Sequence, residues 1–393
     1  MNGNAELPRK FIDDTAQFGA LCQKWQGLAS LALDTEFVRT STFYSNIGLL
    51  QIADLDTCYL VDPLRISDWT EFSLLLSDSQ CCFVIHSCSE DLNLLFTALK
   101  VLPAKVFDTQ LAAAFLNMGY SVSYQSLVSE LLGVHVVKDE TRSDWLRRPL
   151  TDTQISYAAA DVNYLLQLQA LLEQQLQDKG VLEWFSAECE QRILLAPKFE
   201  EKKNWQSLYA GFRNAWRLSD EGLRNLQTLC YWREQEARRR NKPRSWIAKD
   251  QDLLSIAMHL AEAENGSLDG LLAAGSVDKR LLDRYGNKLL RLMQSRHSDF
   301  SSIDRGLLNP PLTAPLRKKL KACQVLVNLK AAELDIAPEL LGRKKYLQEL
   351  IRGFESSGQI RWEGELSGWR RQVLEGDITL VLMGENQDNG NGS

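Results

Sequence analysis

Three short apolar runs near the start of the chain are each followed by polar and turn-forming residues. They cover residues 28–33, 48–53 and 59–61. Runs of this length that are separated by turns are typical of β-strands, and short consecutive strands favour hairpin connections. The pattern therefore predicts an antiparallel meander of three strands.

Beyond residue 69, amphipathic stretches alternate with further short apolar runs. The pattern predicts strands at 82–86 and 105–108 and helices at 69–76, 90–99, 109–116, 124–132 and from 152 onward to about 179. The order is strands first, then alternating strands and helices, then helices alone. This order indicates one mixed α/β domain that ends near residue 195.

The rest of the chain reads as helical, except for a strand expected at Ile378–Met383. It contains an internal similarity at an offset of 94 residues, in which Leu226 falls on Leu320 and Ile247 falls on Leu341. Two related helical modules explain this similarity. Chance matching between two amphipathic helical stretches is the alternative.

A charged connector at 196–205 marks an exposed boundary between the two parts of the chain. We therefore expect domains at 1–197, 205–290 and 305–383. The polar, Asn/Gly-rich segment 384–393 is expected to be a disordered tail.

Composition adds an asymmetry of charge to this division. The length of 393 residues exceeds that of one typical domain. Residues 1–197 carry 13 Lys and Arg against 25 Asp and Glu, a net charge of −12, and residues 198–393 carry 32 against 26, a net charge of +6. Clustered carboxylates suit divalent cations, and a basic half suits a phosphate backbone. Uneven surface decoration explains the charges equally well.

The eight cysteines are scattered without the spacing of a metal site, which favours a reduced compartment. The N-terminal segment lacks the apolar core of a signal peptide, and no stretch is long and apolar enough for a transmembrane helix. We therefore expect a cytoplasmic protein that does not enter a membrane.

Asp34 and Glu36 follow the first apolar run, two residues apart. The period of two in a strand places both side chains on the same face. There each raises the pKa of the other unless a positive charge lies between them. Taken alone, this pair is weak evidence, because strand ends often carry solvated acids.

Two further acids lie on predicted helices. Asp91 begins the helix after the strand at 82–86, where an acid also favours the positive end of the helix dipole. Asp161 follows the alanines 158–160, so it is expected to be buried, and a buried carboxylate needs a partner. Tyr157 lies four residues earlier on the same helix face.

The segments that carry these acids are Asp34-Thr-Glu-Phe-Val-Arg, His86-Ser-Cys-Ser-Glu-Asp and Tyr157-Ala-Ala-Ala-Asp. In order and spacing they resemble the three motifs of DEDD-superfamily exonucleases, in the subclass that carries a tyrosine. The segment 138–150, which precedes the third motif, narrows the resemblance to the ribonuclease D family. The resemblance implies a ribonuclease H-like mixed sheet flanked by helices, followed by all-α HRDC-type domains.

Residues 216–257 resemble the HRDC domain, a small helical module that binds nucleic acid. A second, more divergent copy, as in the ribonuclease D family, agrees with the offset of 94 residues. That copy has no tryptophan matching Trp232 or Trp246, and it keeps only the shorter basic run 343–345. This departure puts its nucleic-acid role in doubt.

For the acids, the resemblance implies two divalent ions, Mg²⁺ or Mn²⁺, since both prefer clustered hard oxygen ligands. The resemblance also implies that Asp34 would bridge the two ions, that Glu36 and Asp161 would complete the first site, and that Asp91 would hold the second ion. Tyr157 orients the attacking water, because a phenol with a pKa of about 10 is a poor base at neutral pH. Ordinary packing of the Tyr157 ring is the alternative.

Residues beside the acids are expected to have supporting roles. Phe37 and Val38 are candidates to stack on or pack against the terminal nucleotide. Core packing is an equal alternative for both. His86 is expected to cap the turn after its strand rather than to act as a base.

Basic residues are candidates for contacts to RNA phosphates. Arg142 and Arg148 lie just before the third motif, where Trp145 is expected to anchor the loop to the domain. The first helical module adds a basic run with a solvated helix end as its alternative. Its members are Arg238, Arg239, Arg240, Lys242 and Arg244.

The sequence therefore predicts a hydrolytic 3′–5′ exoribonuclease that acts as a monomer. It is expected to release 5′-mononucleotides and to trim the 3′ ends of tRNA precursors and other small structured RNAs. Two alternatives stay open: a Werner-type 3′–5′ DNA exonuclease, which shares the three motifs, and a catalytically silent RNA-binding adaptor. The reaction class follows from the residues, whereas the preference for RNA follows from the resemblance alone.

Overall fold

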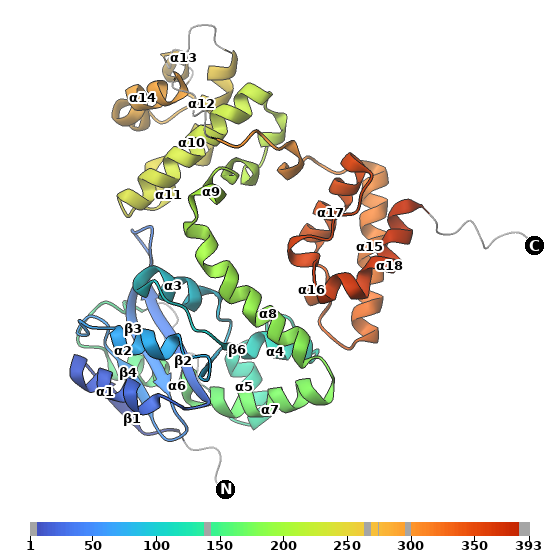
Figure 1. The fold of residues 1–393 in the computed structure, drawn as a ribbon. Helices are drawn as coiled ribbons and strands as arrows, with labels where there is room; N and C mark the ends of the chain where they lie inside the picture. Colours follow the sequence, from blue (N-terminus) through green and yellow to red (C-terminus); the bar gives the residue numbers. More distant parts are fainter. Residues whose placement is uncertain (1–5, 137–142, 263–268, 274, 295–299, 385–393) are drawn as a thin grey trace, which may run out of the picture.

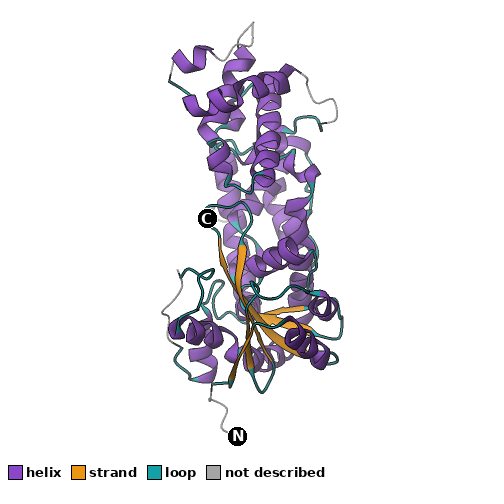
Figure 2. Cartoon of the chain, turned by 90° about the vertical axis from the view of Figure 1, so that its left-hand side faces the viewer, coloured by secondary structure: helices purple, strands orange, loops and turns teal. Residues whose placement is uncertain are grey.

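The structure is a computed structural model that describes residues 6–136, 143–262, 269–273, 275–294 and 300–384. A sheet-containing part lies at one end of the molecule, and helices make up the rest (Figures 1 and 2). The predicted tail, apart from Gly384, lies outside the described residues.

The sheet has six strands in the order β1-β4-β3-β2-β5-β6. Their bounds are β1 (Arg9–Ile12), β2 (Ser30–Val38), β3 (Asn46–Ala53), β4 (Cys58–Val61), β5 (Cys82–Ile85) and β6 (Val106–Asp108). Only the pairs β2–β3 and β3–β4 are antiparallel, which confirms the predicted meander. Strand β1 was not predicted, because three of its four residues are exposed and it has no apolar run.

Strand β2 is longer than its apolar run suggested. The run ends at Leu33, but the strand continues to Val38, so Asp34 and Glu36 lie within the strand and not after it. Asp34 pairs with Gln51 of β3, and a bulge follows Glu36. The apolar run 28–33 thus marks only part of the strand, and β2 includes two acids although acids are generally depleted in strands.

Helices cover both faces of the sheet. On one face, Leu31 and Leu33 of β2 join a core with α1 (Thr15–Trp25), α2 (Thr70–Leu76) and α3 (Ser89–Leu99). On the other face, Ala32 joins a core with α4 (Thr109–Phe115), α5 (Tyr124–Leu132), α6 (Asp152–Asn163) and α7 (Leu165–Asp178). The period of two places Asp34 and Glu36 on the face of Ala32, which α6 covers.

The long helix α8 leads from the sheet to the first helical module (Figure 1). The bounds are α8 (Leu182–Leu195), η1 (Ala196–Glu200), α9 (Lys202–Trp205), η2 (Leu208–Gly211), η3 (Ala215–Arg217), α10 (Asp220–Arg239), α11 (Arg244–Ile247), α12 (Asp250–Glu262), α13 (Asp269–Ala273) and α14 (Lys279–Gln294). The charged connector thus folds as η1 and α9. We call α10–α14 the first helical module.

The second helical module contains η4 (Arg305–Leu307), α15 (Ala314–Glu333), α16 (Pro338–Leu341), α17 (Lys344–Ser357), η5 (Gly364–Leu366) and α18 (Trp369–Met383). Helices α15, α16 and α17 each begin 94 residues after α10, α11 and α12, which confirms the internal repeat. The strand predicted at Ile378–Met383 was wrong. These β-branched and apolar residues lie in α18, where Ile378 and Leu382 are buried against the other helices of the module.

The second module packs directly on the sheet-containing part. Its residues share one apolar core with α4–α8, and the indoles of Trp369 and Trp184 stack with centroids 4.9 Å apart. The eight cysteines are unpaired and buried. Within the described ranges, no helix has both the length and the apolar character that a bilayer span requires.

Candidate active site

Three of the four predicted acids meet where α6 crosses β2. Carboxylate oxygens of Asp34, Glu36 and Asp161 lie within 4.8 Å of one another. Asp34 and Glu36 come from the face of β2 that α6 covers, and Asp161 comes from the last turns of α6. They line an open pocket of about 520 Å³, which we call the catalytic pocket.

Asp91 lies on another wall of the catalytic pocket, outside that tight group. It is buried in the first turn of α3, where its carboxylate accepts a hydrogen bond from the Thr35 hydroxyl. Thr35 was not predicted as a site residue. Its side chain points away from those of Asp34 and Glu36, and only the packing of α3 against the sheet reveals its contact with Asp91.

The pKa values of all four acids are raised, and for Asp34 and Glu36 the neighbouring acids contribute to the rise. Burial, followed by the charges of Asp91 and Asp161, raises the pKa of Asp34 well above its usual range. Burial, again with the charges of Asp161 and Asp91, raises the pKa of Glu36 to about 8. Burial raises the pKa of Asp91 and that of Asp161 to about 7. Together these shifts show that the pocket is short of positive charge at neutral pH.

The ligand set of the pocket fits divalent cations of the hard type. All four side chains offer carboxylate oxygens, and none of the residues that line the pocket is a cysteine. Such oxygen clusters suit Mg²⁺ or Mn²⁺ better than Zn²⁺. A cation among these acids would also supply the counter-charge that their raised pKa values call for.

Tyr157 lines the catalytic pocket one helical turn before Asp161. Burial and the negative charges of Asp161 and Glu36 raise its pKa above the usual range, so the phenol keeps its proton. Its ring lies 6.1 Å from that of Trp145, which is buried. A Cβ at Gly48 would come within 2.5 Å of the Trp145 Cβ, so this packing requires a glycine in β3.

His86 uses both ring nitrogens within the protein. Nε2 lies 3.1 Å from the Val122 carbonyl oxygen, and Nδ1 lies 2.9 Å from the Thr109 hydroxyl. Because a carbonyl only accepts, Nε2 carries the proton and Nδ1 accepts from Thr109. Burial lowers the pKa of His86. The residue therefore supports the wall of the pocket as a neutral imidazole.

The two residues after the first motif separate. Phe37 lines the catalytic pocket. Val38 packs against the core of the sheet-containing part. Phe37 thus forms part of the pocket wall, and Val38 has the packing role that was its alternative.

Arg148 is committed to the protein. Nε and Nη2 donate to the two carboxylate oxygens of Asp62 at 2.7 and 2.6 Å, Nη2 also donates to the Gly48 carbonyl, and Nη1 donates to the Trp145 carbonyl. This arrangement corrects the expectation that Arg148 contacts a phosphate, because its donors hold the loop around Trp145. Arg142 lies outside the described residues.

The predicted basic run divides into buried and exposed members. The side chain of Arg238 is buried, with ion pairs to Glu200 and Glu234 and a hydrogen bond to Tyr44. Arg240 donates to the Tyr285 hydroxyl, although the residue is exposed. Buried ion pairs of this kind make Arg238 part of the junction between the two halves of the molecule.

The other three members of the run are partly or mostly exposed. The side chain of Arg239 is 70% exposed and pairs with Glu236, and that of Arg244 is 41% exposed and pairs with Glu234. The Lys242 ammonium lies 5.6 Å from the ring centre of Trp246, whose indole is exposed. These positions keep a cationic and aromatic surface on the first helical module.

The chain matches two protein-family models. Residues 10–177 match the 3′–5′ exonuclease family, and residues 223–293 match the HRDC domain. The first match covers the sheet and the helices that carry the acids. The second covers most of the first helical module.

Relatives named ribonuclease D align with nearly all of the chain. The protein from Pseudomonas paraeruginosa is 36% identical over 365 residues, which are 93% of this chain and 95% of that protein. The protein from Escherichia coli is 32% identical over 357 residues, which are 90% and 93% of the two chains.

Solved structures agree with this assignment. The crystal structure of Escherichia coli RNase D, described as an exoribonuclease involved in structured RNA processing, superposes with a TM-score of 0.82 at 30% identity and covers 97% of this chain and 100% of that chain. The catalytic core of RRP6 from Trypanosoma brucei shares the fold, with a TM-score of 0.53 at 22% identity over 74% of this chain and 81% of that chain. The chain therefore belongs to the ribonuclease D family of 3′–5′ exoribonucleases.

Proposed function

We propose that the enzyme hydrolyses RNA from the 3′ end with two divalent cations, Mg²⁺ or Mn²⁺, held by the four acids of the catalytic pocket. The group formed by Asp34, Glu36 and Asp161 is the observation that carries this proposal. Asp34 would be a ligand of both ions. Glu36 and Asp161 would be ligands of the first ion, and Asp91 would be a ligand of the second. The ions would activate water and neutralise charge at the phosphorus and at the leaving 3′ oxygen.

The remaining pocket residues would position the reactants. Tyr157 keeps its proton, so it would orient the attacking water by hydrogen bonding and would not remove its proton. Thr35 would fix the carboxylate of Asp91 by the hydrogen bond described above. Phe37 would stack on the terminal base, a contact that every base can make.

We propose 5′-mononucleotides as products and the 3′ ends of tRNA precursors and other small structured RNAs as substrates. Support comes from the relative whose structure is described as an exoribonuclease involved in structured RNA processing. Arg239, Lys242, Arg244 and Trp246 would contact the body of such an RNA. We also propose that the protein is a monomer and that it acts in the cytoplasm.

A matched pair of substrates tests the preference for RNA. One is an RNA hairpin with a single-stranded 3′ overhang, and the other is the same sequence in DNA. With Mg²⁺ present, we expect stepwise release of 5′-mononucleotides and faster cleavage of the RNA. Equal or faster cleavage of the DNA would favour the DNA exonuclease, and binding without cleavage would favour the adaptor.

A further inference from the structure

A groove lies at the junction between the loop that follows β2 and the first helical module. It has a volume of about 660 Å³, and we call it the junction groove. Its charged and aromatic lining residues are Arg39, Phe43, Arg233, Arg244, Lys249 and Asp250. Four cations thus face one acid among the residues that line it.

Two of these cations are neutralised within the protein. Arg233 donates to the Asp250 carboxylate at 2.6 Å. Arg244 pairs with Glu234, and its guanidinium lies 5.0 Å from the centre of the Phe43 ring. Their charges are therefore balanced before any ligand arrives.

The other two cations are unbalanced. Arg39 and Lys249 are exposed, and neither side chain forms a hydrogen bond or ion pair with another residue in the part of the chain that the structure describes. Arg39 lies on the exonuclease wall of the groove and Lys249 on the helical wall. Two solvated positive charges on facing walls suit a chain of phosphates.

The two walls are held together by the loop itself. The backbone N–H groups of Phe43 and Tyr44 both donate to Asn241 Oδ1 at 3.0 Å. The ring of Phe43 is buried in the core of the first helical module, 4.6 Å from the Arg238 guanidinium. Arg39 and Lys249 are therefore attached to walls with a fixed separation.

The junction groove begins beside the catalytic pocket. Phe37 lines the pocket and Arg39 lines the groove. Two residues of extended chain span about 7 Å. An RNA strand that leaves the catalytic pocket past Phe37 would therefore reach Arg39 next.

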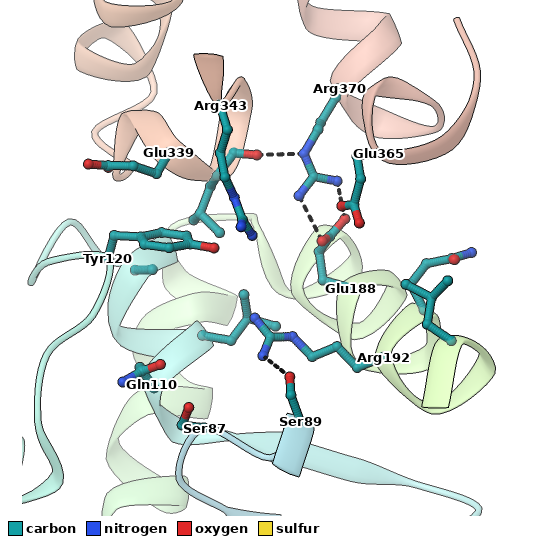
Figure 3. Close-up of a pocket in the computed structure, with 15 residues that line it drawn as sticks. Ser87, Ser89, Gln110, Tyr120, Glu188, Arg192, Glu339, Arg343, Glu365 and Arg370 are labelled. Carbon is teal, nitrogen blue, oxygen red and sulfur yellow. Dashed lines mark hydrogen bonds and ion pairs between the residues drawn. The ribbon is translucent and has the colours of Figure 1, made fainter. Parts of the chain in front are cut away.

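A second groove also opens from the catalytic pocket, between α8 and the second helical module (Figure 3). It shares Ser87, Ser89 and Gln110 with the pocket. Arg192 in this groove pairs with Asp108, and Arg370 pairs with Glu188.

The remaining charges of the second groove do not favour a phosphate. Arg343 stacks over the Tyr120 ring at 5.1 Å, while Glu339 and Glu365 also line the groove. Its three arginines thus face three glutamates, whereas the junction groove carries an excess of cations. Electrostatics favours the junction groove for an RNA strand.

We propose that the junction groove binds the phosphodiester backbone of single-stranded RNA upstream of the reacting 3′ end, with Arg39 and Lys249 each contacting a phosphate. The proposal rests on the proposed function, because it takes RNA as the substrate. The contacts carry no base preference, since both side chains meet only the backbone.

Binding to a labelled single-stranded 12-nucleotide RNA tests the groove across a range of salt concentrations. All proteins are full-length and carry Asp34→Asn, so that the RNA is not degraded. Each phosphate contact on a single strand contributes about 0.7 to the slope of log affinity against log salt concentration. Between 1 M and 0.1 M salt, that slope corresponds to about five-fold in affinity. Arg39→Ala with Lys249→Ala should therefore weaken binding about 25-fold and lower the slope by about 1.4.

Three further proteins make the result specific. Lys318→Ala with Lys321→Ala removes two exposed charges on α15 and should bind like the parent. Arg343→Ala removes the stacked arginine of the second groove and should also bind like the parent. Arg39→Lys with Lys249→Arg keeps both charges and should keep the salt slope of the parent.

The outcomes separate this proposal from the proposed function. If the protein with Asp34 intact releases nucleotides but the double alanine variant keeps the parental salt slope, the groove proposal is wrong and the nuclease proposal stands. A loss of RNA affinity that occurs only in Arg343→Ala would place the RNA strand in the second groove. If the intact protein releases no nucleotide from any RNA, the proposed function fails whatever the binding results.

Discussion

The catalytic pocket and the junction groove carry opposite charges and hold them in opposite ways. The acids of the pocket are partly or fully buried, and their pKa values are raised. Arg39 and Lys249 of the groove are exposed. Desolvated charges need a specific counter-ion, whereas solvated charges give a graded, salt-dependent attraction. The pocket should therefore control turnover and the groove should control affinity.

Asp34→Asn should separate turnover from RNA affinity most clearly. Loss of a carboxylate that serves both ions removes several kcal/mol of transition-state stabilisation, on the order of 10³-fold or more in kcat. RNA affinity should change little. Single-turnover hydrolysis and binding measurements check both, with Asp56→Asn, an exposed acid outside the pocket, as the control. Near-parental turnover would mean that the metal site is misplaced.

Arg238→Ala tests the contrast inside the basic run. The side chain of Arg238 is 7% exposed, and its removal takes the ion pair from Glu200 and one of two arginine partners from Glu234. Breaking a buried pair destabilises by about 3 kcal/mol. Arg239→Ala, which removes a mostly exposed charge, should destabilise the protein much less. Urea denaturation compares the two, and equal losses would contradict the distinction between buried and exposed cations.

Tyr157→Phe probes a pocket residue that has no charge. One hydrogen bond to a charged group contributes about 1.5–3 kcal/mol, so kcat should fall roughly 10- to 100-fold while KM stays close to that of the parent. The alkaline side of the pH–rate profile should not move, because the phenol is not the base. A shift of that limb would show that Tyr157 transfers a proton.

The stability of the metal-free protein should depend on pH with a definite sign. Between about pH 4 and pH 8 the folded pocket keeps protons that the unfolded chain has lost, because the pKa of Glu36 is raised to about 8 and those of Asp91 and Asp161 to about 7. The free energy of unfolding therefore falls as pH rises through this window. We expect the Tm to fall by several degrees, and Mg²⁺ to restore it at pH 8 more than at pH 5. For Asp34→Asn we expect the Tm to depend less steeply on pH than in the parent. An equal dependence would show that the effect does not arise in the catalytic pocket.

Local pattern was sufficient to predict much of the fold and the positions of the acids. The spacing of two between Asp34 and Glu36 predicts a shared strand face, and the alanines before Asp161 predict a helix that can approach the sheet closely. The structure brings these three together as that pattern implies. The apolar run 28–33 did not reveal that β2 continues to Val38, because the partners that extend it lie on β3.

Long-range partners account for what the sequence did not reveal. In the sequence, Arg148 is a candidate phosphate ligand. In the structure, its guanidinium donates to Asp62, which lies 86 residues earlier in the chain. Arg238 reads as solvated until Glu200 and the loop after β2 enclose it. The run Ile378–Met383 reads as a strand because its residues favour strands, yet packing within the second helical module makes it a helix. Arg39 ends the first motif segment, but its place in the junction groove depends on the folded arrangement of the two walls.

Metal dependence of 3′-end hydrolysis tests the central claim most directly. The substrate is a uniformly labelled single-stranded RNA, incubated with the full-length enzyme and Mg²⁺, Mn²⁺ or EDTA. We predict stepwise shortening from the 3′ end and release of 5′-mononucleotides with either ion, and no release with EDTA. Release at the same rate in EDTA, or no release with either ion, would contradict the account.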